Sequence, residues 1–243
     1  MSDTAHGPVL CGFGAAEAGL GGLAWDVGEP GALLLSGGEV RAATFALEEG
    51  GDATALEIRT DDVTVEATLI PQTAAITLGG KTSRIALEVI ACASEVRFAG
   101  EAQTSRCPGQ ISRWFGDPLE GAATFRHLAI NAGDDSLLVA EARGEIGARG
   151  HGDELSEAWL LQGEDVTRFE DVFISTEYDG DGDPTRLGLE LWPEEAERAS
   201  RAAATRAAGS GLGGVKTGAA WAGLFRCNTH GSEGSGNYLL WRG

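Results

Sequence analysis

The chain has 243 residues, of which 37 are acidic and 18 are basic, and its formal net charge is -19 at neutral pH. Nucleic acids and anionic membrane surfaces attract dense positive charge, so this balance argues against both as partners. No stretch approaches the ~20 apolar residues of a membrane span, and the glycine-rich amino-terminal segment lacks the features of a secretory signal. We therefore predict a cytoplasmic protein, and the sequence leaves its oligomeric state open.

The four cysteines lie far apart in the sequence. Cys11, Cys92, Cys107 and Cys227 have neither the paired spacing of a zinc site nor the density of a disulfide scaffold. We interpret them as reduced thiols. Only Cys227 has a histidine close in sequence, His230, so a catalytic Cys-His pair is the alternative.

Short runs of alternating apolar and polar residues, separated by Gly- and Asp-rich breaks, dominate the chain from residue 32 onward. A period of two residues is typical of strands in an antiparallel sheet. Asp61 and Asp62 mark a hairpin turn, and residues 133–135 mark another. Strands are predicted, in chain order, over residues 56–59, 63–69, 84–90, 96–99, 123–130, 136–142, 155–161, 172–178, 186–192 and 237–241. Strands recurring this regularly indicate barrels or sandwiches.

One segment departs from this pattern. Residues 194–208 are rich in Ala, Glu and Arg, follow a proline and precede a glycine. These are helix start and stop signals, so the segment predicts one short surface helix. The alternative is an Ala-rich strand that imitates a helix.

The length allows one large β-domain or two smaller ones. The Pro- and Gly-containing region 107–118 is the best candidate for a midpoint. A faint echo pairs the aromatic-Ala-Gly and Arg-Cys motifs at residues 98–100 and 106–107 with those at 221–223 and 226–227. We therefore predict two barrel-like halves, residues 1–116 and 117–243.

The most polar stretch of the second half is residues 149–159. It places His151 between two glycines, with Asp153 and Glu154 directly after it. An imidazole needs only a small environmental shift to titrate near neutral pH, so this cluster can supply a general acid or base. The alternative is a polar loop ahead of the strand at 155–161.

Two other histidines carry weaker signals. His230 lies in the Gly- and Ser-rich connection 228–236, where a loop histidine can close over a pocket, although a plain hairpin loop is the commoner case. His127 lies in the strand run 124–128, where we expect a half-buried ring with one hydrogen-bond partner. We keep His230 as a candidate ligand contact and assign no role to His127.

An acidic turn has the spacing of a calcium site. Asp179, Asp181, Asp183 and Glu190 fall at the first, third, fifth and twelfth positions of a calcium-binding loop. The position that normally takes glycine holds Pro184, whose fixed backbone angle cannot replace it. The flanking runs alternate as strands do. We therefore prefer a hairpin turn and keep the calcium loop as the alternative.

No cofactor or metal is predicted from the remaining motifs. The glycine strings 12–14 and 209–214 do not join a strand to a helix, and they lack the ending of a phosphate loop. The six tryptophans outnumber the two tyrosines, and large rings in strands usually fill a core. Rings that line a barrel cavity would instead form an apolar pocket.

Three segments together resemble a known family: residues 149–153, the hairpin from 175–178 to 189–192, and the closing segment 230–240. They resemble uncharacterised bacterial proteins and, more remotely, the lipocalin-like (calycin-like) double-barrel family of carotenoid hydratases and cofactor-free cyclases. The resemblance implies an all-β chain with two antiparallel barrels side by side and a hydrophobic small molecule held in or between them. The hydratases protonate an alkene with a buried acid, but no catalytic motif matches here residue by residue.

The first functional hypothesis is a binding protein for a small hydrophobic or amphipathic molecule in an aromatic-lined cavity. Trp159 and Trp192 would form the apolar wall. Polar groups would orient the ligand, namely His151, Asp153, Tyr178 and the loop residue His230.

The second hypothesis is a cofactor-independent hydratase, isomerase or cyclase. His151 would move the proton, or a carboxylate among Asp153, Glu154 and Asp171 would do so, because a carboxyl buried among aromatic rings has the raised pKa of a general acid. The third hypothesis is a structural module that binds a partner through an exposed apolar patch.

Overall fold

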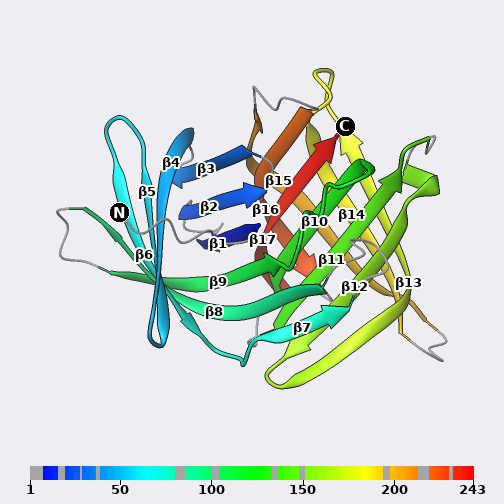
Figure 1. Cartoon of the computed structure of the whole chain (residues 1–243), viewed down its shortest axis with the longest axis horizontal. Coiled ribbons are helices and arrows are strands. Elements are labelled where there is room, and N and C mark those ends of the chain that lie inside the picture. Colours follow the sequence, from blue (N-terminus) through cyan, green and yellow to red (C-terminus); the bar gives the residue numbers. More distant parts are fainter. Residues whose placement is uncertain are drawn as a thin grey trace.

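The computed structural model describes residues 8–15, 20–27, 29–36, 39–79, 86–99, 104–132, 136–147, 151–193, 198–212, 219–229 and 232–243. Nearly all of these residues form strands, and the strands close into two antiparallel barrels of eight strands each. Figure 1 shows the first barrel, coloured blue to green, beside the second, coloured green to red. The predicted all-β, lipocalin-like fold with two barrels is confirmed.

The first barrel is closed by non-sequential pairing. Its sheet runs in the order β6-β5-β4-β3-β2-β1-β9-β8, and β8 pairs back to β6, while the short β7 pairs with β8 alone. The strands are β1 (Val9–Ala15), β2 (Leu20–Val27), β3 (Glu29–Ser36), β4 (Glu39–Gly50), β5 (Ala53–Arg59), β6 (Thr64–Pro71), β7 (Ile76–Gly79), β8 (Ala86–Phe98) and β9 (Ser105–Trp114). Alternate side chains such as Leu56 and Ile58 fill its interior.

The second barrel is a simple meander in which each strand pairs with the next and β17 returns to β10. Its strands are β10 (Ala122–Ala132), β11 (Ser136–Glu145), β12 (Leu155–Gln162), β13 (Asp165–Tyr178), β14 (Pro184–Pro193), β15 (Ser200–Leu212), β16 (Ala219–Thr229) and β17 (Ser232–Arg242). Apolar side chains pack together in its interior, among them Leu128, Ile174, Leu189 and Phe225. A small barrel of this kind is filled by its own side chains.

A third apolar cluster joins the two barrels. It contains Trp25 and Trp114 from the first barrel and Phe125, Trp159 and Trp241 from the second. The outward faces of β9 and β10 therefore share one core. The strands place the barrels on either side of the short segment between β9 and β10, while the division at residue 116 stays a prediction.

The predicted helix at 194–208 is wrong where the structure describes it. Residues from Ser200 onward form β15, which pairs with β14 and β16 along its length. Ala202 and Ala204 point into the barrel, while Arg201 and Ala203 are exposed. Hydrogen bonds to strands on both sides outweigh the helix propensity of alanine, which is a weak preference. Residues 194–197 lie outside the described residues.

Other sequence expectations have mixed outcomes. The hairpin turn at Asp61 and Asp62 is confirmed between β5 and β6, whereas residues 133–135 lie outside the described residues. All four cysteines are buried free thiols. No helix in the described part of the chain is long and apolar enough to cross a membrane.

Candidate functional site

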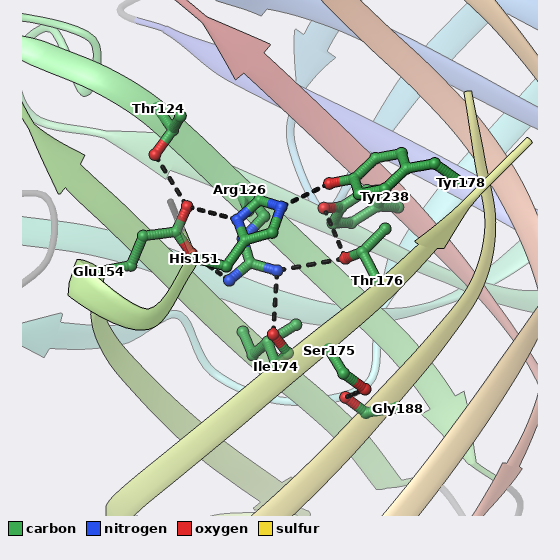
Figure 2. A network of polar contacts seen from close by, with 10 residues as sticks. All are labelled: Thr124, Arg126, His151, Glu154, Ile174, Ser175, Thr176, Tyr178, Gly188 and Tyr238. Atoms are coloured by element: carbon green, nitrogen blue, oxygen red, sulfur yellow. Dashed lines mark hydrogen bonds and ion pairs between the residues drawn. The ribbon is translucent and has the colours of Figure 1, made fainter. Parts of the chain in front are cut away.

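A group of polar side chains gathers at one end of the second barrel (Figure 2). Arg126 points into the barrel because it alternates with Phe125, whose ring faces the core between the barrels. Thr176 and Tyr178 lie at the end of β13, and Glu154 lies directly before β12. His151 belongs to a short 3-10 turn, η2 (His151–Asp153), that leads into that strand.

The Glu154 carboxylate is the centre of this group, and its side chain is 0% exposed. It pairs with the guanidinium of Arg126, which is equally buried, and it accepts a hydrogen bond from the Thr124 hydroxyl at 2.8 Å. Burial raises the pKa of Glu154, but hydrogen bonds from His151 and Thr124 and the charge of Arg126 outweigh it and hold that pKa below its ordinary value. The carboxylate is therefore ionised at neutral pH.

Arg126 is fixed by further partners on the opposite wall. Its Nη1 donates to the Ile174 carbonyl oxygen at 3.1 Å and to the Thr176 hydroxyl at 3.2 Å. The Tyr238 hydroxyl lies 3.5 Å from the same Thr176 oxygen, and burial raises the pKa of Tyr238 to about 12. The Arg126 guanidinium thus connects β10, β13 and the turn before β12. Because of its raised pKa, the Tyr238 hydroxyl stays protonated at neutral pH.

The His151 ring lies between a carboxylate and a phenol. Its Nδ1 is 2.8 Å from Glu154 Oε1, and its Nε2 is 2.6 Å from the Tyr178 hydroxyl. The two aromatic rings stack with centroids 5.9 Å apart. An ionised Glu154 can only accept, so Nδ1 carries a hydrogen, and Nε2 faces the Tyr178 hydroxyl.

This order of groups has a defined chemical capacity. A buried carboxylate orients an imidazole, which in turn contacts a hydroxyl that can exchange a proton with it. The carboxylate also stabilises the imidazolium form. The side chain of His151 is 33% exposed. In this hydrogen-bonded row, Glu154 is therefore shielded from solvent, whereas His151 and Tyr178 are partly exposed.

The rim of this barrel end is part apolar and part basic. Ile146 is 81% exposed and Leu155 is 50% exposed, and they lie on either side of the turn that carries His151. The guanidinium carbon of Arg242 lies over the Tyr178 ring, 4.9 Å from its centroid. A molecule that reaches His151 therefore meets apolar surface and a cation.

The structure brings together three of the residues predicted from the sequence, His151, Glu154 and Tyr178. It does not bring the others to them. Asp153 is exposed in the same turn, and Asp171 is exposed in β13, where it lies opposite the half-buried Trp192 of β14. The other predicted positions are Trp159, which is buried in the core between the barrels, and His230, which lies outside the described residues. The individual roles of all these residues stay predictions.

The acidic turn is explained without a metal. Oδ1 of Asp179 accepts the backbone N–H of Asp181 at 3.1 Å and that of Asp183 at 2.9 Å. Its Oδ2 accepts from Arg206 at 3.0 Å. The described residues contain no group of three or more His, Cys, Asp or Glu side chains placed to hold a metal ion. Asp179 thus closes the hairpin turn that the sequence favoured.

Cys227 points into the second barrel, and burial raises the pKa of its thiol to about 12. Such a thiol does not form the thiolate that a nucleophile needs at neutral pH. The catalytic Cys-His alternative therefore has no support from Cys227.

A second hydrogen-bonded group of polar side chains, which the sequence analysis did not predict, lies between the barrels. His127 is fully buried with two partners, not half-buried with one: Nε2 is 3.2 Å from the Ser112 hydroxyl and Nδ1 is 3.1 Å from Glu141. Trp114 Nε1 donates to the same carboxylate at 2.8 Å. Ser112 and Trp114 come from the first barrel, so no local pattern in the sequence signals this contact.

This second hydrogen-bonded group is inaccessible to substrates in this structure, because Ser112, His127 and Glu141 are all 0% exposed. A small cavity nearby, lined by Gln110 and Asn237, has room for about 10 Å³ of solvent, which is the size of one water molecule. The barrel end around His151 is therefore the better candidate for a site that meets a ligand.

The fold is a lipocalin-like double barrel, and one barrel end carries the hydrogen-bonded group of Glu154, His151 and Tyr178. Kievitone hydratase from Nectria haematococca has a similar structure, with a TM-score of 0.71, 11% identity, and coverage of 99% of this chain and 90% of that one. CghA crystallised with Sch210972 matches with a TM-score of 0.57 at 11% identity, covering 97% and 87% of the two chains. At this identity the likeness shows the fold alone. No protein-family model and no curated protein sequence matches the chain.

Proposed function

We propose that this protein is a cofactor-independent acid-base enzyme, a hydratase, isomerase or cyclase of a hydrophobic or amphipathic small molecule. The observation that carries the proposal is the His151 ring, which lies between the ionised, buried Glu154 and the hydroxyl of Tyr178 while remaining one-third exposed. Hydrogen bonds that served only stability would not require the His151 ring, which lies between the other two groups, to stay exposed to solvent. The hydratase name of one structural neighbour supports the same class of reaction.

The hypothesis of a binding protein without catalysis has weaker support. Its predicted apolar wall, Trp159 and Trp192, lies away from the barrel interior, in the core between the barrels and on the outer face of β14. Packed apolar side chains occupy the interior itself. The barrel end offers proton-transfer groups in place of an aromatic cage.

Proton transfer follows from the hydrogen bonds. In the neutral state His151 Nε2 accepts from the Tyr178 hydroxyl, and in the protonated state Nε2–H donates to the phenol oxygen, which frees the Tyr178 hydrogen for the substrate. When Tyr178 gives its proton to an alkene or enol carbon, the Nε2 proton moves to the tyrosine oxygen. Glu154 holds the imidazole in position throughout and stabilises its charge.

The fate of the cation formed on the substrate decides the outcome. Attack by water, whose surplus proton returns to His151, gives a hydration. Loss of a neighbouring proton to His151 gives an isomer. Attack by a second double bond closes a ring and leaves a new cation on the substrate, which then loses a proton to His151. In each case His151 recovers the Nε2 proton that it gave to Tyr178, so the ring ends in its starting state.

The test is conversion in deuterated water. A panel of apolar alkenes, polyenes, prenylated phenols and unsaturated carboxylic acids is incubated with the protein, and mass spectrometry records addition of water or incorporation of one deuteron. We expect turnover that falls roughly 100-fold or more in His151→Gln and in Tyr178→Phe, the size of a general acid-base contribution. Asp165→Asn, an exposed carboxylate on β13, is the matched control and should retain wild-type turnover.

Two results would count against the proposal. One is a panel in which the wild type converts no compound. The other is a His151→Gln variant that converts a compound as fast as the wild type does, because the proton would then come from elsewhere.

A further inference from the structure

Arg242 occupies a position that the proton-transfer scheme does not use. It is the last residue of β17, in alternation with Tyr238 and Leu240, which point into the second barrel. Its guanidinium carbon lies 4.9 Å from the centroid of the Tyr178 ring, so the side chain reaches the mouth of the same barrel end. The residue is half-buried, so it is not sealed off from solvent.

Strand register confirms that Arg242 and the site share one end of the barrel. Arg242 pairs with Thr124 of β10, and Thr124 pairs in turn with Gly144 of β11. The Thr124 hydroxyl is the group that donates to Glu154. One row of residues across β17, β10 and β11 therefore leads from Arg242 to the carboxylate, and the exposed Ile146 follows two residues beyond Gly144.

The charge of Arg242 is not balanced as that of its neighbours is. Arg126 pairs with Glu154, and Arg206 pairs with Asp179. Arg242 forms no ion pair with an Asp or Glu among the residues that the structure describes. The chain has a net charge of -19, yet the described carboxylates leave this arginine available. A guanidinium has the fork geometry that binds a carboxylate through two hydrogen bonds.

We propose that the substrate is an amphiphile with an anionic oxygen group, a carboxylate, which Arg242 binds above the Tyr178 ring. The apolar part of such a molecule would lie against the rim formed by Ile146 and Leu155. In this pose the carbons next to the carboxylate would lie toward the Tyr178 hydroxyl. The assignment as substrate rests on the proposed function, whereas the preference for an anion can be measured without turnover.

The experiment compares octanoate with 1-octanol, which have the same chain length and differ in charge. Calorimetric titration of the intact protein at pH 8 should give a dissociation constant for octanoate about tenfold or more below that for 1-octanol, as expected for a hydrogen-bonded charge pair. The preference should weaken with added salt. Arg242→Gln should abolish it, and Arg242→Lys should retain part of it.

Arg226→Gln is the matched control, since Arg226 is an exposed arginine on the neighbouring strand β16. This variant should keep the full preference for octanoate, which separates the local effect of Arg242 from the change in net charge. Equal binding of the two probes by the wild type overturns the inference, and so does a preference that survives in Arg242→Gln. Failure of the proposed function looks different, because octanoate would still bind preferentially while no compound is converted.

Discussion

Removing the Glu154 charge alone should destabilise the protein far more than removing the whole ion pair. In Glu154→Gln the shape is kept, but the Arg126 guanidinium, only 1% exposed, loses its counter-charge. Breaking a buried pair by removing one partner costs about 3–5 kcal/mol, because the remaining charge is left uncompensated. We expect a loss of this size in Glu154→Gln, in Glu154→Leu and again in Arg126→Met, and the last two are the single variants against which the double variant is compared.

The double variant Arg126→Met/Glu154→Leu should behave differently. Replacing both members of a buried pair with apolar residues of similar volume is often close to neutral, so we expect a total loss below about 2 kcal/mol. Thr124 and His151, which also donate to Glu154, are half-buried and can turn to solvent. The coupling between the two sites should therefore be several kcal/mol, beyond the range of ordinary neighbours.

Urea unfolding followed by tryptophan fluorescence measures these free energies. The matched control is the pair Arg201 and Glu190 on the outer face of the same barrel, 3.3 Å apart with side chains 77% and 39% exposed. Its coupling should stay within about 1 kcal/mol, the usual limit for an exposed pair. Additive losses in the Arg126 and Glu154 variants would refute the reasoning, since they would mean that neither charge depends on the other.

Three more predictions follow from burial and packing. The folded-state pKa of Glu154 lies below its ordinary value of 4.5, so its contribution to stability is present above pH 4.5 and is lost as the pH falls through the lower folded value. The urea midpoint of the wild type should therefore fall in this acid range, and in Glu154→Gln it should fall less. Burial raises the pKa of Cys11 and Cys92 to about 12, so a thiol reagent at pH 8 should label neither until urea unfolds the protein. An added Cβ at Gly236 would lie 2.8 Å from the backbone oxygen of Ala129, so Gly236→Ala should cost roughly 1–3 kcal/mol in unfolding free energy. Gly50→Ala, with open space around it, should change that free energy by less than about 0.5 kcal/mol.

The sequence predicts strands well where one face of the strand is buried. Leu56 and Ile58 point inward and their neighbours outward, so the period of two survives in the residue types. The two-residue alternation fails to reveal β15, because alanine lies both inside and outside the barrel there and the two faces do not differ in polarity. Pairing with β14 and β16 decides the structure there, and pairing is a long-range property.

The same distinction applies to the candidate site. His151 and Glu154 are three residues apart, so their polar character is visible as a local cluster. Arg126 was missed because it lies inside a strand with an apolar pattern, and its partners at Glu154 and Ile174 come from the closure of the barrel. Ser112 and His127 meet only because two barrels share a core.

Closure of the second barrel also explains where its chemistry can lie. The interior is occupied by apolar side chains, so a charged group placed midway along it would be buried without partners. At the barrel end the strands stop, and the turn before β12 can supply Glu154 to Arg126 from outside the sheet. The carboxylate there is dry enough to hold its interactions strongly, while His151, one hydrogen bond further out, still reaches solvent. A proton-transfer group needs both conditions at once, and among the polar clusters described here the barrel end provides them within a single hydrogen-bonded chain.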